Sequence, residues 1–243
     1  MKVSIVIPTY NHLENCLRKC VESVRRNSDF SKIPTEVVVV ANGCRDGTED
    51  YVRSLGEPYR LLSTPEPLGF VRATNAGAMV ATGEYLLFLN DDVQVLDWGA
   101  GNGWLRMLMD PLEADPKLGI TCTNRDLWSV GRYFAVFFCA MTRRKLFIET
   151  GLLDEAFGIG CGEDCDYSMK VQDKGYGILQ VPTQHDHWAT NFPIWHVGHA
   201  TFAGVEGKGR ENTAILEKRY PRTEVDKATQ IRFSLGSMNR GLQ

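Results

Sequence analysis

Short apolar runs alternate with segments of helical period through the first part of the chain. Uninterrupted apolar runs rich in β-branched residues are typical of strands buried on both faces of a parallel sheet. Such runs cover residues 3–7, 36–41 and 85–89, and residues 59–63 are a further candidate strand. The segments between them predict helices over residues 13–24, 48–55 and 69–82, and small residues in the last one favour close packing. This alternation predicts an α/β fold with a parallel sheet.

The second part of the chain has a less regular pattern. It predicts helices over residues 103–114, 143–150, 163–174 and 211–220, and strands over residues 132–141 and 176–181. Residues 182–208 are rich in His, Trp and Pro and are expected to form a loop. Because no repeat, low-complexity segment or flexible linker divides the chain, we expect one continuous domain with two parts.

Polar segments follow three of the predicted strands. Residues 9–11, 42–48 and 90–92 each come directly after a buried run. In open parallel sheets, ligands bind beyond the carboxyl ends of the strands, so these segments are expected to meet around a ligand. Asp91 and Asp92 repel each other unless a cation or a hydrogen-bond donor offsets their charge. A simple turn also accounts for adjacent Asn and Asp residues, but the position after a buried strand favours a binding site.

Composition excludes several classes of protein. The 243 residues carry a formal net charge of -3 with scattered Lys and Arg, unlike the basic surface of a nucleic-acid-binding protein. No apolar run approaches the roughly 18 residues that cross a bilayer, and residues 1–11 lack the features of a signal peptide. Seven cysteines, an odd number, imply no disulfide framework, so we expect a cytoplasmic protein.

Four segments in order resemble one known family. They read VSIVIPTYN, VVVVANGCRDGT, PLGFVRATNAGAMVATGEYLLFLNDD and GLLDEAFGIGCGEDCDYSMKVQDKGYGI. Together they resemble the inverting nucleotide-sugar glycosyltransferases of family two with the GT-A fold, over residues 3–182. The resemblance implies a Rossmann-like, mostly parallel sheet flanked by helices. It also implies a donor-binding half at residues 1–95, and an acceptor-binding and catalytic-base half at residues 96–243.

The resemblance implies a divalent metal site after the fourth strand. The family's acidic motif, usually Asp-x-Asp, reads Asn90-Asp91-Asp92 here, with Asn in place of the first acid. Asp92 is then the leading ligand and Asp91 the second residue facing the donor diphosphate, with Mn²⁺ or Mg²⁺ as the cation. His196 matches a C-terminal His that completes the metal sphere in this family.

Three further histidines lie near His196 in the sequence. His185, His187 and His199 fall in the same segment, with His199 as an alternative ligand. His-x-His and His-x-x-His spacings also suit a separate zinc site, and loop histidines without a role are a third explanation. The sequence leaves these possibilities open.

The resemblance assigns donor contacts to two further loops. Thr9, Tyr10 and Asn11 match the first nucleotide-binding loop, which reaches the base and ribose. Asn42 stands where the family often has Asp, and with Asp46 it would read the edge of the base. Asn11 and Asp46 also suit the N-caps of the helices that follow them, so both explanations remain.

Arg72 and Asn75 lie on the helix expected over residues 69–82. They are about one turn apart and share a face, which could meet ribose or diphosphate. A surface position for Arg72 is the alternative.

The segment Gly162-Glu163-Asp164 resembles the family's Glu-Asp pair. The resemblance implies Asp164 as general base on the acceptor hydroxyl, with Glu163 as the alternative base or an acceptor contact. Acids are also favoured in a first helical turn by the helix dipole. That explanation accounts for the charges but not for this order of residues ahead of an amphipathic helix.

The substrates are predicted only as classes. The donor is expected to be a UDP-, GDP- or dTDP-sugar, and the acceptor a sugar, a lipid-linked sugar or a protein, with peripheral contact at a membrane surface allowed. Aromatic faces stack on sugars, which makes Trp98 an acceptor candidate, whereas Trp104 sits at core spacing. A sugar-phosphate nucleotidyltransferase and a non-catalytic nucleotide- or carbohydrate-binding module are the alternatives. The absence of a basic Gly-rich loop near the N-terminus counts against the first, and the intact acids count against the second.

Overall fold

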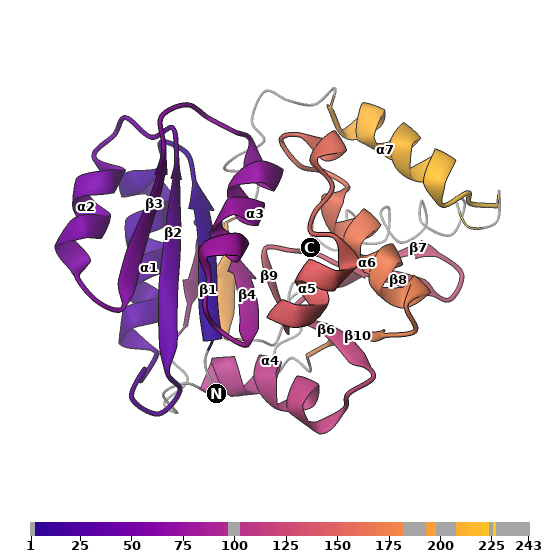
Figure 1. The fold of residues 1–243 in the computed structure, drawn as a ribbon, viewed down its shortest axis with the longest axis horizontal. Helices are drawn as coiled ribbons and strands as arrows, with labels where there is room; N and C mark the ends of the chain where they lie inside the picture. The colour runs from indigo at the N-terminus through magenta and orange to yellow at the C-terminus, as the bar shows by residue number, and fades with distance from the viewer. Residues whose placement is uncertain (1–2, 97–102, 182–192, 198–207, 224–225, 227–243) are drawn as a thin grey trace, which may run out of the picture.

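The computed structural model describes residues 3–96, 103–181, 193–197, 208–223 and 226. A seven-stranded sheet with the order β10-β6-β9-β4-β1-β2-β3 forms its centre (Figure 1). Its strands are β1 (Val3–Thr9), β2 (Thr35–Asn42), β3 (Tyr59–Thr64), β4 (Tyr85–Leu89), β6 (Leu118–Cys122), β9 (Cys139–Arg143) and β10 (Gly177–Gln180). All neighbours are parallel except β9, which is antiparallel to both β4 and β6. The predicted mostly parallel α/β sheet is confirmed.

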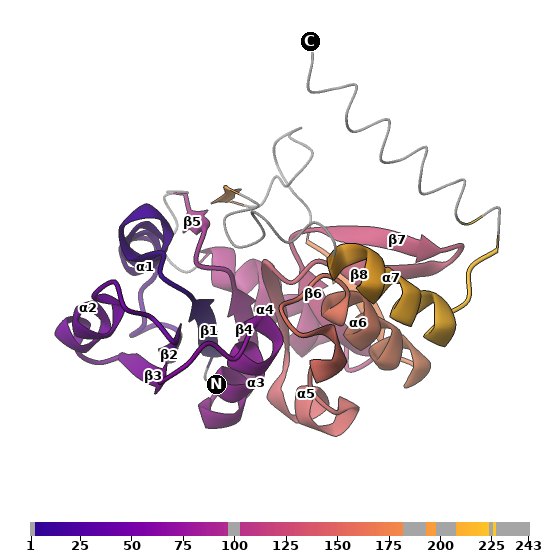
Figure 2. The same cartoon turned by 90° about the horizontal axis from the view of Figure 1, so that it is seen from above.

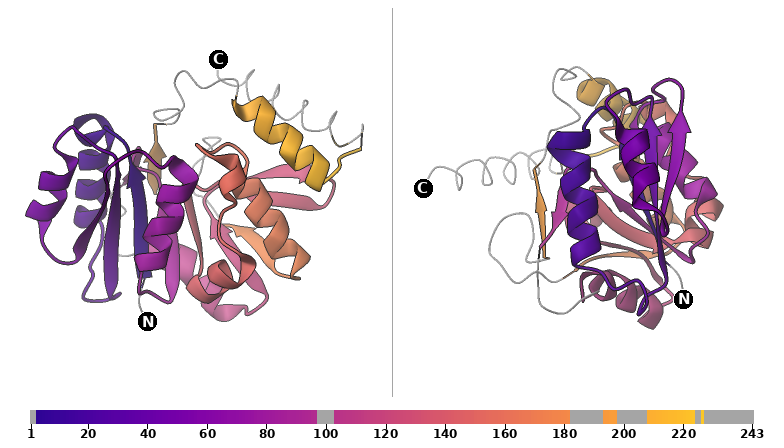
Figure 3. Two further views of the ribbon diagram at one scale, coloured as in Figure 1. Left: turned by 45° about the horizontal axis from the view of Figure 1, so that its top comes forward. Right: turned by 90° about the vertical axis from the view of Figure 1, so that its left-hand side faces the viewer.

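Helices pack on both faces of the sheet (Figures 2 and 3). One core contains side chains of α1 (Arg18–Arg26), α2 (Thr48–Leu55) and α4 (Gly103–Ala114). The other contains side chains of α3 (Phe70–Val80), α5 (Arg144–Thr150), α6 (Glu163–Asp173) and α7 (Lys208–Arg219). Ile5 and Ile7 belong to the first core and Val6 to the second, because successive side chains of a strand point to opposite faces. Burial on both faces explains why these strands read as continuous apolar runs.

The small residues of α3 allow the helix to approach the sheet closely. A Cβ at Gly77 would lie 2.5 Å from Val6 Cγ1 and 2.8 Å from Val40 Cγ2. A side chain there would therefore push α3 away from β1 and β2. The close packing predicted from the sequence is confirmed, and it places the start of α3 beside the carboxyl ends of these strands.

Two expectations for the second part of the chain are wrong. The apolar stretch over residues 132–141 forms two strands, β8 (Arg132–Ala135) in a hairpin with β7 (Arg125–Ser129), and β9 in the main sheet. Phe137 and Phe138 between them are buried, so the run stays apolar while the chain passes from one sheet to another. In the expected loop, β11 (Ile194–His196) pairs antiparallel with β5 (Val93–Val95), and strands this short leave no periodic signal.

The first helical segment begins differently from the prediction. Asn11 has φ 54° and its Oδ1 accepts a hydrogen bond from the Arg45 backbone N–H, so it does not cap the helix. His12 occupies the N-cap position, and the chain enters η1 (Leu13–Leu17), a π-helical turn that continues into α1. The left-handed backbone at Asn11 turns the loop toward Arg45 and away from the helix axis.

Other general expectations can be compared with the described residues. All seven cysteines are free thiols in this structure. Trp104 is buried, in agreement with its core spacing, whereas Trp98, His185, His187 and His199 lie outside the described residues. Within the described part of the chain, every helix is too short or too polar to cross a bilayer.

Candidate active site

A cavity of about 350 Å³ lies at the carboxyl ends of β1, β2 and β4. It is lined by Pro8, Thr9, Tyr10, Asn42, Pro67, Gly69, Phe70, Asn90, Asp91 and Ile159. The three polar segments expected to converge therefore do meet at one edge of the sheet. A larger cavity of about 530 Å³ lies at the opposite end, beside the start of β4 and of α5. The rule for parallel sheets favours the cavity at the carboxyl ends as the ligand site.

Asp91 is buried and held by two side chains, one from the last residue of β1 and one from the loop that follows. Its Oδ2 accepts a hydrogen bond of 2.6 Å from Thr9 Oγ1 and lies 3.5 Å from His12 Nδ1. The neighbouring carboxylate of Asp91 raises the pKa of His12, although partial burial acts in the opposite direction. His12 was not among the site residues predicted from the sequence, although it directly follows the predicted polar segment 9–11. The two contacts fix one oxygen of Asp91 at the cavity wall.

Asp92 lies beside the predicted second ligand, His196. The β5–β11 pair places His196 opposite Val93, and Asp92 Oδ1 is 3.2 Å from His196 Nε2. Phe138 stacks on the imidazole with ring centroids 4.2 Å apart, and the Val197 backbone N–H donates to the Asp92 carbonyl oxygen. These contacts orient the imidazole toward the carboxylate. Asp92 and His196 are far apart in the sequence and were expected to bind the same metal ion. In the structure their side chains lie in contact.

The side chains of Asp92 and His196 provide ligand atoms that fit a divalent cation. Asp92 Oδ1 is buried and has no hydrogen-bond partner within the described part of the chain, which leaves a lone pair available. A carboxylate oxygen and an imidazole nitrogen are both ligands of first-row divalent metals. Among the described residues, no group of three or more His, Cys, Asp or Glu side chains converges as a ligand set.

Glu163 and Asp164 open helix α6. Glu163 is buried, and its Oε2 has no hydrogen-bond partner in the regions that the structure describes. Asp164 is half-buried and its Oδ1 accepts a hydrogen bond of 2.7 Å from the Cys165 backbone N–H. Burial raises the pKa of both carboxyl groups, and the charge of Asp164 raises that of Glu163 further. A carboxylate with a raised pKa is a better proton acceptor near neutral pH.

Other residues predicted to bind the nucleotide-sugar donor make hydrogen bonds within the protein. Asn42 lines the cavity while its Oδ1 accepts from the Leu68 backbone N–H at 2.6 Å. Asp46 accepts from the Leu13 backbone N–H with one oxygen, and from Thr48 N and Oγ1 with the other. Asp46 thus joins the start of η1 to the start of α2, but Gly47 and not Asp46 occupies the N-cap position of α2.

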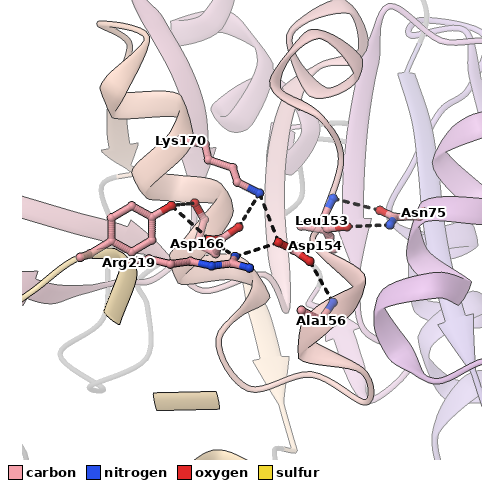
Figure 4. A network of polar contacts seen from close by, with 8 residues as sticks. Asn75, Leu153, Asp154, Ala156, Asp166, Lys170 and Arg219 are labelled. Atoms are coloured by element: carbon pink, nitrogen blue, oxygen red, sulfur yellow. Dashed lines mark hydrogen bonds and ion pairs between the residues drawn. The ribbon is translucent and has the colours of Figure 1, made fainter. Parts of the chain in front are cut away.

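Arg72 and Asn75 connect α3 to the segment before α6. The Arg72 Nε lies 2.8 Å from Glu155 Oε2 at the surface. Asn75 is buried and exchanges two hydrogen bonds with the Leu153 backbone, one through its amide nitrogen and one through its oxygen (Figure 4). Both side chains therefore bind protein groups in this structure.

The segment that leads into α6 also reaches the cavity. Ile159 forms part of the cavity wall, and the Val71 backbone N–H donates to the Gly158 carbonyl oxygen at 3.3 Å. A Cβ at Gly69 would lie only 3.0 Å from that same oxygen, so Gly69 allows the two segments to touch. The loop before Glu163 and Asp164 thus borders the region where the strand-end acids lie.

Comparison with known proteins identifies relatives of this chain. The model of glycosyl transferase family 2 matches residues 4–136, more than half of the chain. The glycosyltransferase AglE of Haloferax volcanii is 37% identical over 93 residues, which cover 37% of this chain and 30% of AglE. The chain therefore spans less than a third of the length of this curated relative.

Two solved structures share the fold at low sequence identity. The crystal structure of GalNAc-T7 with UDP, GalNAc and Mn²⁺ has a TM-score of 0.63 and 18% identity, and covers 74% of this chain and 42% of that one. The mannosyltransferase PcManGT of Pyrobaculum calidifontis, in complex with GDP-Man and Mn²⁺, has a TM-score of 0.58 and 22% identity, and covers 74% and 54%. With this fold, and with the family model matched across the donor-side strands, the chain belongs to glycosyl transferase family 2.

Proposed function

We propose that this chain transfers a sugar from a nucleoside-diphosphate-sugar to an acceptor hydroxyl with inversion. One observation carries the proposal: the buried Asp91 lines a cavity at the carboxyl ends of β1, β2 and β4, and the adjacent buried acid, Asp92, faces His196. Family membership supports sugar transfer as the reaction class.

The donor side of the site would hold the nucleotide. Thr9, Tyr10 and Asn42 line the cavity, and Tyr10 keeps 43% of its surface exposed. An exposed aromatic ring beside apolar walls can stack on a nucleobase. The two solved relatives contain UDP and GDP-Man, which supports testing uridine and guanosine donors first.

Asp92 and His196 would hold the divalent cation. When bound, such a cation neutralises the negative charge that develops on the departing diphosphate. Thr9 and His12 hold Asp91 in place next to this pair. The Mn²⁺ in both solved relatives supports manganese, with magnesium as the alternative.

Asp164 would accept the proton of the acceptor hydroxyl. As this proton moves to the carboxylate, the acceptor oxygen bonds to the anomeric carbon and the bond from that carbon to the phosphate oxygen breaks. Attack from the face opposite the diphosphate inverts the configuration. The raised pKa of Asp164 supports this role because it makes the carboxylate a stronger base. Glu163 is the alternative base.

Release of nucleoside diphosphate tests the proposal. UDP-, GDP- and dTDP-sugars would be incubated with the protein, with and without Mn²⁺, and free nucleoside diphosphate measured. We expect release that depends on Mn²⁺ and that falls in Asp92→Asn and Asp164→Asn. Asp110→Asn, on the exposed face of α4, is the matched control. Release of pyrophosphate would indicate a nucleotidyltransferase, and no release with any donor would indicate a binding module.

A further inference from the structure

The loop between α5 and α6 needs support from other elements. Apart from η2 (Glu155–Phe157) it is irregular, and four residues near its end have positive φ: Gly158, Gly160, Cys161 and Gly162. Local backbone preferences do not stabilise this path, because positive φ is unfavourable for residues other than glycine. This applies particularly to Cys161, where φ is 70°. The loop leads directly into Glu163 and Asp164. Whatever fixes its path therefore also fixes the start of α6.

Helix α3 holds one side of this loop. The Val71 N–H reaches Gly158, and Asn75 exchanges two hydrogen bonds with Leu153. These contacts tie the loop to the donor half of the molecule.

Helix α7 holds the other side. Asn212 is buried, and its Nδ2 donates to two loop carbonyl oxygens, Phe157 O at 3.1 Å and Gly160 O at 2.6 Å. Leu216, one turn further along, packs against the end of the loop, since a Cβ at Gly162 would lie 3.2 Å from Leu216 Cδ1. Figures 1 and 3 show α7 lying against α6 and this loop. The amide of Asn212 thus fixes two loop carbonyl groups at once.

Arg219 ties both ends of the loop together. Its Nη1 lies 2.7 Å from Asp154 Oδ2, at the start of η2, and 2.7 Å from Asp166 Oδ1, in the first turn of α6 (Figure 4). Asp166 is fully buried, and Lys170 Nζ lies 2.6 Å from its other oxygen. Two carboxylates and two cations thus balance within this cluster. Asp166 shares the first turn of α6 with Asp164, so the cluster fixes the turn that carries the proposed base.

We propose that α7 is a clamp on the acceptor side of the site, with Asn212 and Arg219 as positioning residues. They hold residues 157–162 in one path and so fix the orientation of Asp164 toward the acceptor hydroxyl. The role of Asp164 in this inference rests on the proposed function, whereas the clamping of the loop does not. Neither residue lines the cavity that would hold the donor, although Ile159 of the clamped loop does. Loss of the clamp is therefore expected to lower turnover more than donor binding.

Hydrogen exchange tests the clamp independently of any substrate. Asn212→Ala removes both donors while keeping a good helix former, and Thr213→Ala, on the exposed side of α7, is the control. We expect the backbone amides of residues 158–162 to exchange about tenfold faster or more in Asn212→Ala, with no change in Thr213→Ala. Unchanged exchange in Asn212→Ala would overturn the proposal, whether or not the protein transfers sugar.

A second variant keeps the test valid if Asn212→Ala does not fold. Arg219→Lys retains the cation but loses the planar guanidinium, whose Nη1 contacts both Asp154 and Asp166. It should increase exchange in the same loop by a smaller factor, with Lys218→Gln as its exposed neighbour and control. A thermal melt of each variant establishes that the fold is retained. No change in loop exchange in Arg219→Lys would contradict its assignment as a positioning residue.

Turnover then separates the clamp from the proposed chemistry. With the donor found by nucleoside-diphosphate release, Asn212→Ala should lower kcat about tenfold and change the donor KM by a smaller factor. Faster loop exchange with normal kcat, in a protein that Asp164→Asn inactivates, would overturn the positioning role. Faster loop exchange together with a fully active Asp164→Asn would support the clamp and contradict the proposed base.

Discussion

Two buried glutamates at different places in the molecule have opposite surroundings. Glu36 lies on β2 and is 4% exposed, and its oxygens accept hydrogen bonds from Ser4, Thr82 and Arg60. Glu163, at the start of α6, is 5% exposed, yet its Oε2 has no hydrogen-bond partner among the described residues. Burial opposes ionisation at both sites, but the donors around Glu36 lower its pKa to about 2, whereas that of Glu163 is raised.

The difference separates structural acids from candidate functional acids. Glu36 joins β1, β2 and the end of α3, and its charge is fully compensated, as is usual for a buried group. Glu163 keeps a buried oxygen without a hydrogen-bond partner among the described residues, and the buried Oδ1 of Asp92 has a contact of 3.2 Å with His196 Nε2. An uncompensated buried carboxyl group destabilises the fold and is retained where a ligand or a reaction needs it. Four predictions test this contrast.

The largest expected effect concerns Asp164. Asp164→Asn removes the proposed base and should lower kcat by about a thousandfold, within the range for a general base, with donor binding unchanged. Because the pKa of Asp164 is raised, activity of the wild type should fall as the pH drops, starting well above the ordinary Asp value of about 3.9. A pH–rate profile and donor titrations measure both. Full activity in Asp164→Asn would remove Asp164 from the mechanism.

Glu36→Gln should destabilise the fold without altering the chemistry. Loss of the charge that Arg60 and the hydroxyl donors compensate should lower the free energy of unfolding by about 2 kcal/mol at pH 7. The lowered pKa of Glu36 makes its contribution present above the unfolded value near 4.3 and lost as the pH falls toward about 2. Urea denaturation at several pH values measures this, with Glu113→Gln at an exposed site as control. Equal stability of the two variants at pH 7 would contradict the structural role.

His196→Ala should raise the Mn²⁺ concentration needed for half-maximal activity by about tenfold or more, since one ligand of the cation is lost. Asp92 would still hold the cation through its carboxylate. Activity measured over a Mn²⁺ titration gives the requirement directly. An unchanged requirement would assign the 3.2 Å contact between Asp92 and His196 to a structural ion pair.

The smallest expected effect is the stability of Glu163→Gln. With a raised pKa, Glu163 stays protonated in the folded protein at pH values where the unfolded chain has released the proton. The contribution of protonated Glu163 to the stability of the fold is therefore complete below about pH 4. This contribution is lost as the pH rises and the unfolded chain ionises first. Gln cannot ionise, so the variant should gain about 1 kcal/mol relative to the wild type between pH 5 and pH 8. If the difference in the free energy of unfolding between the two proteins is constant over this range, the charge of Glu163 does not destabilise the folded protein.

The sequence predicted the elements that have strong local signals. β1, β2 and β4 are continuous apolar runs, and α3 is marked by small residues, so the edge of the sheet that carries Asp91 and Asp92 followed from pattern alone. The position of β9 between β4 and β6 did not follow, because an antiparallel neighbour leaves no trace in one strand's composition. The pairing of β11 with β5 was likewise hidden, since three-residue strands have no measurable period.

Residue roles were harder to predict than their positions. Asn75 and Asp46 lie near the expected loops, yet their side chains bind backbone groups, which depends on contacts between segments far apart in the sequence. His12 and Asn212 escaped notice because a single His or Asn has no pattern of its own. Asp92 Oδ1 and His196 Nε2 lie 3.2 Å apart, and their binding of a cation is still a prediction.

Binding of nucleotide with and without Mn²⁺ tests the central claim most directly. Calorimetric titration of UDP and GDP would compare the wild type with Asp92→Asn and with Asp110→Asn. We expect Mn²⁺ to tighten nucleotide binding at least tenfold in the wild type and in Asp110→Asn, and to have little effect in Asp92→Asn. Equal tightening by Mn²⁺ in all three proteins would show that the strand-end acids do not hold the cation.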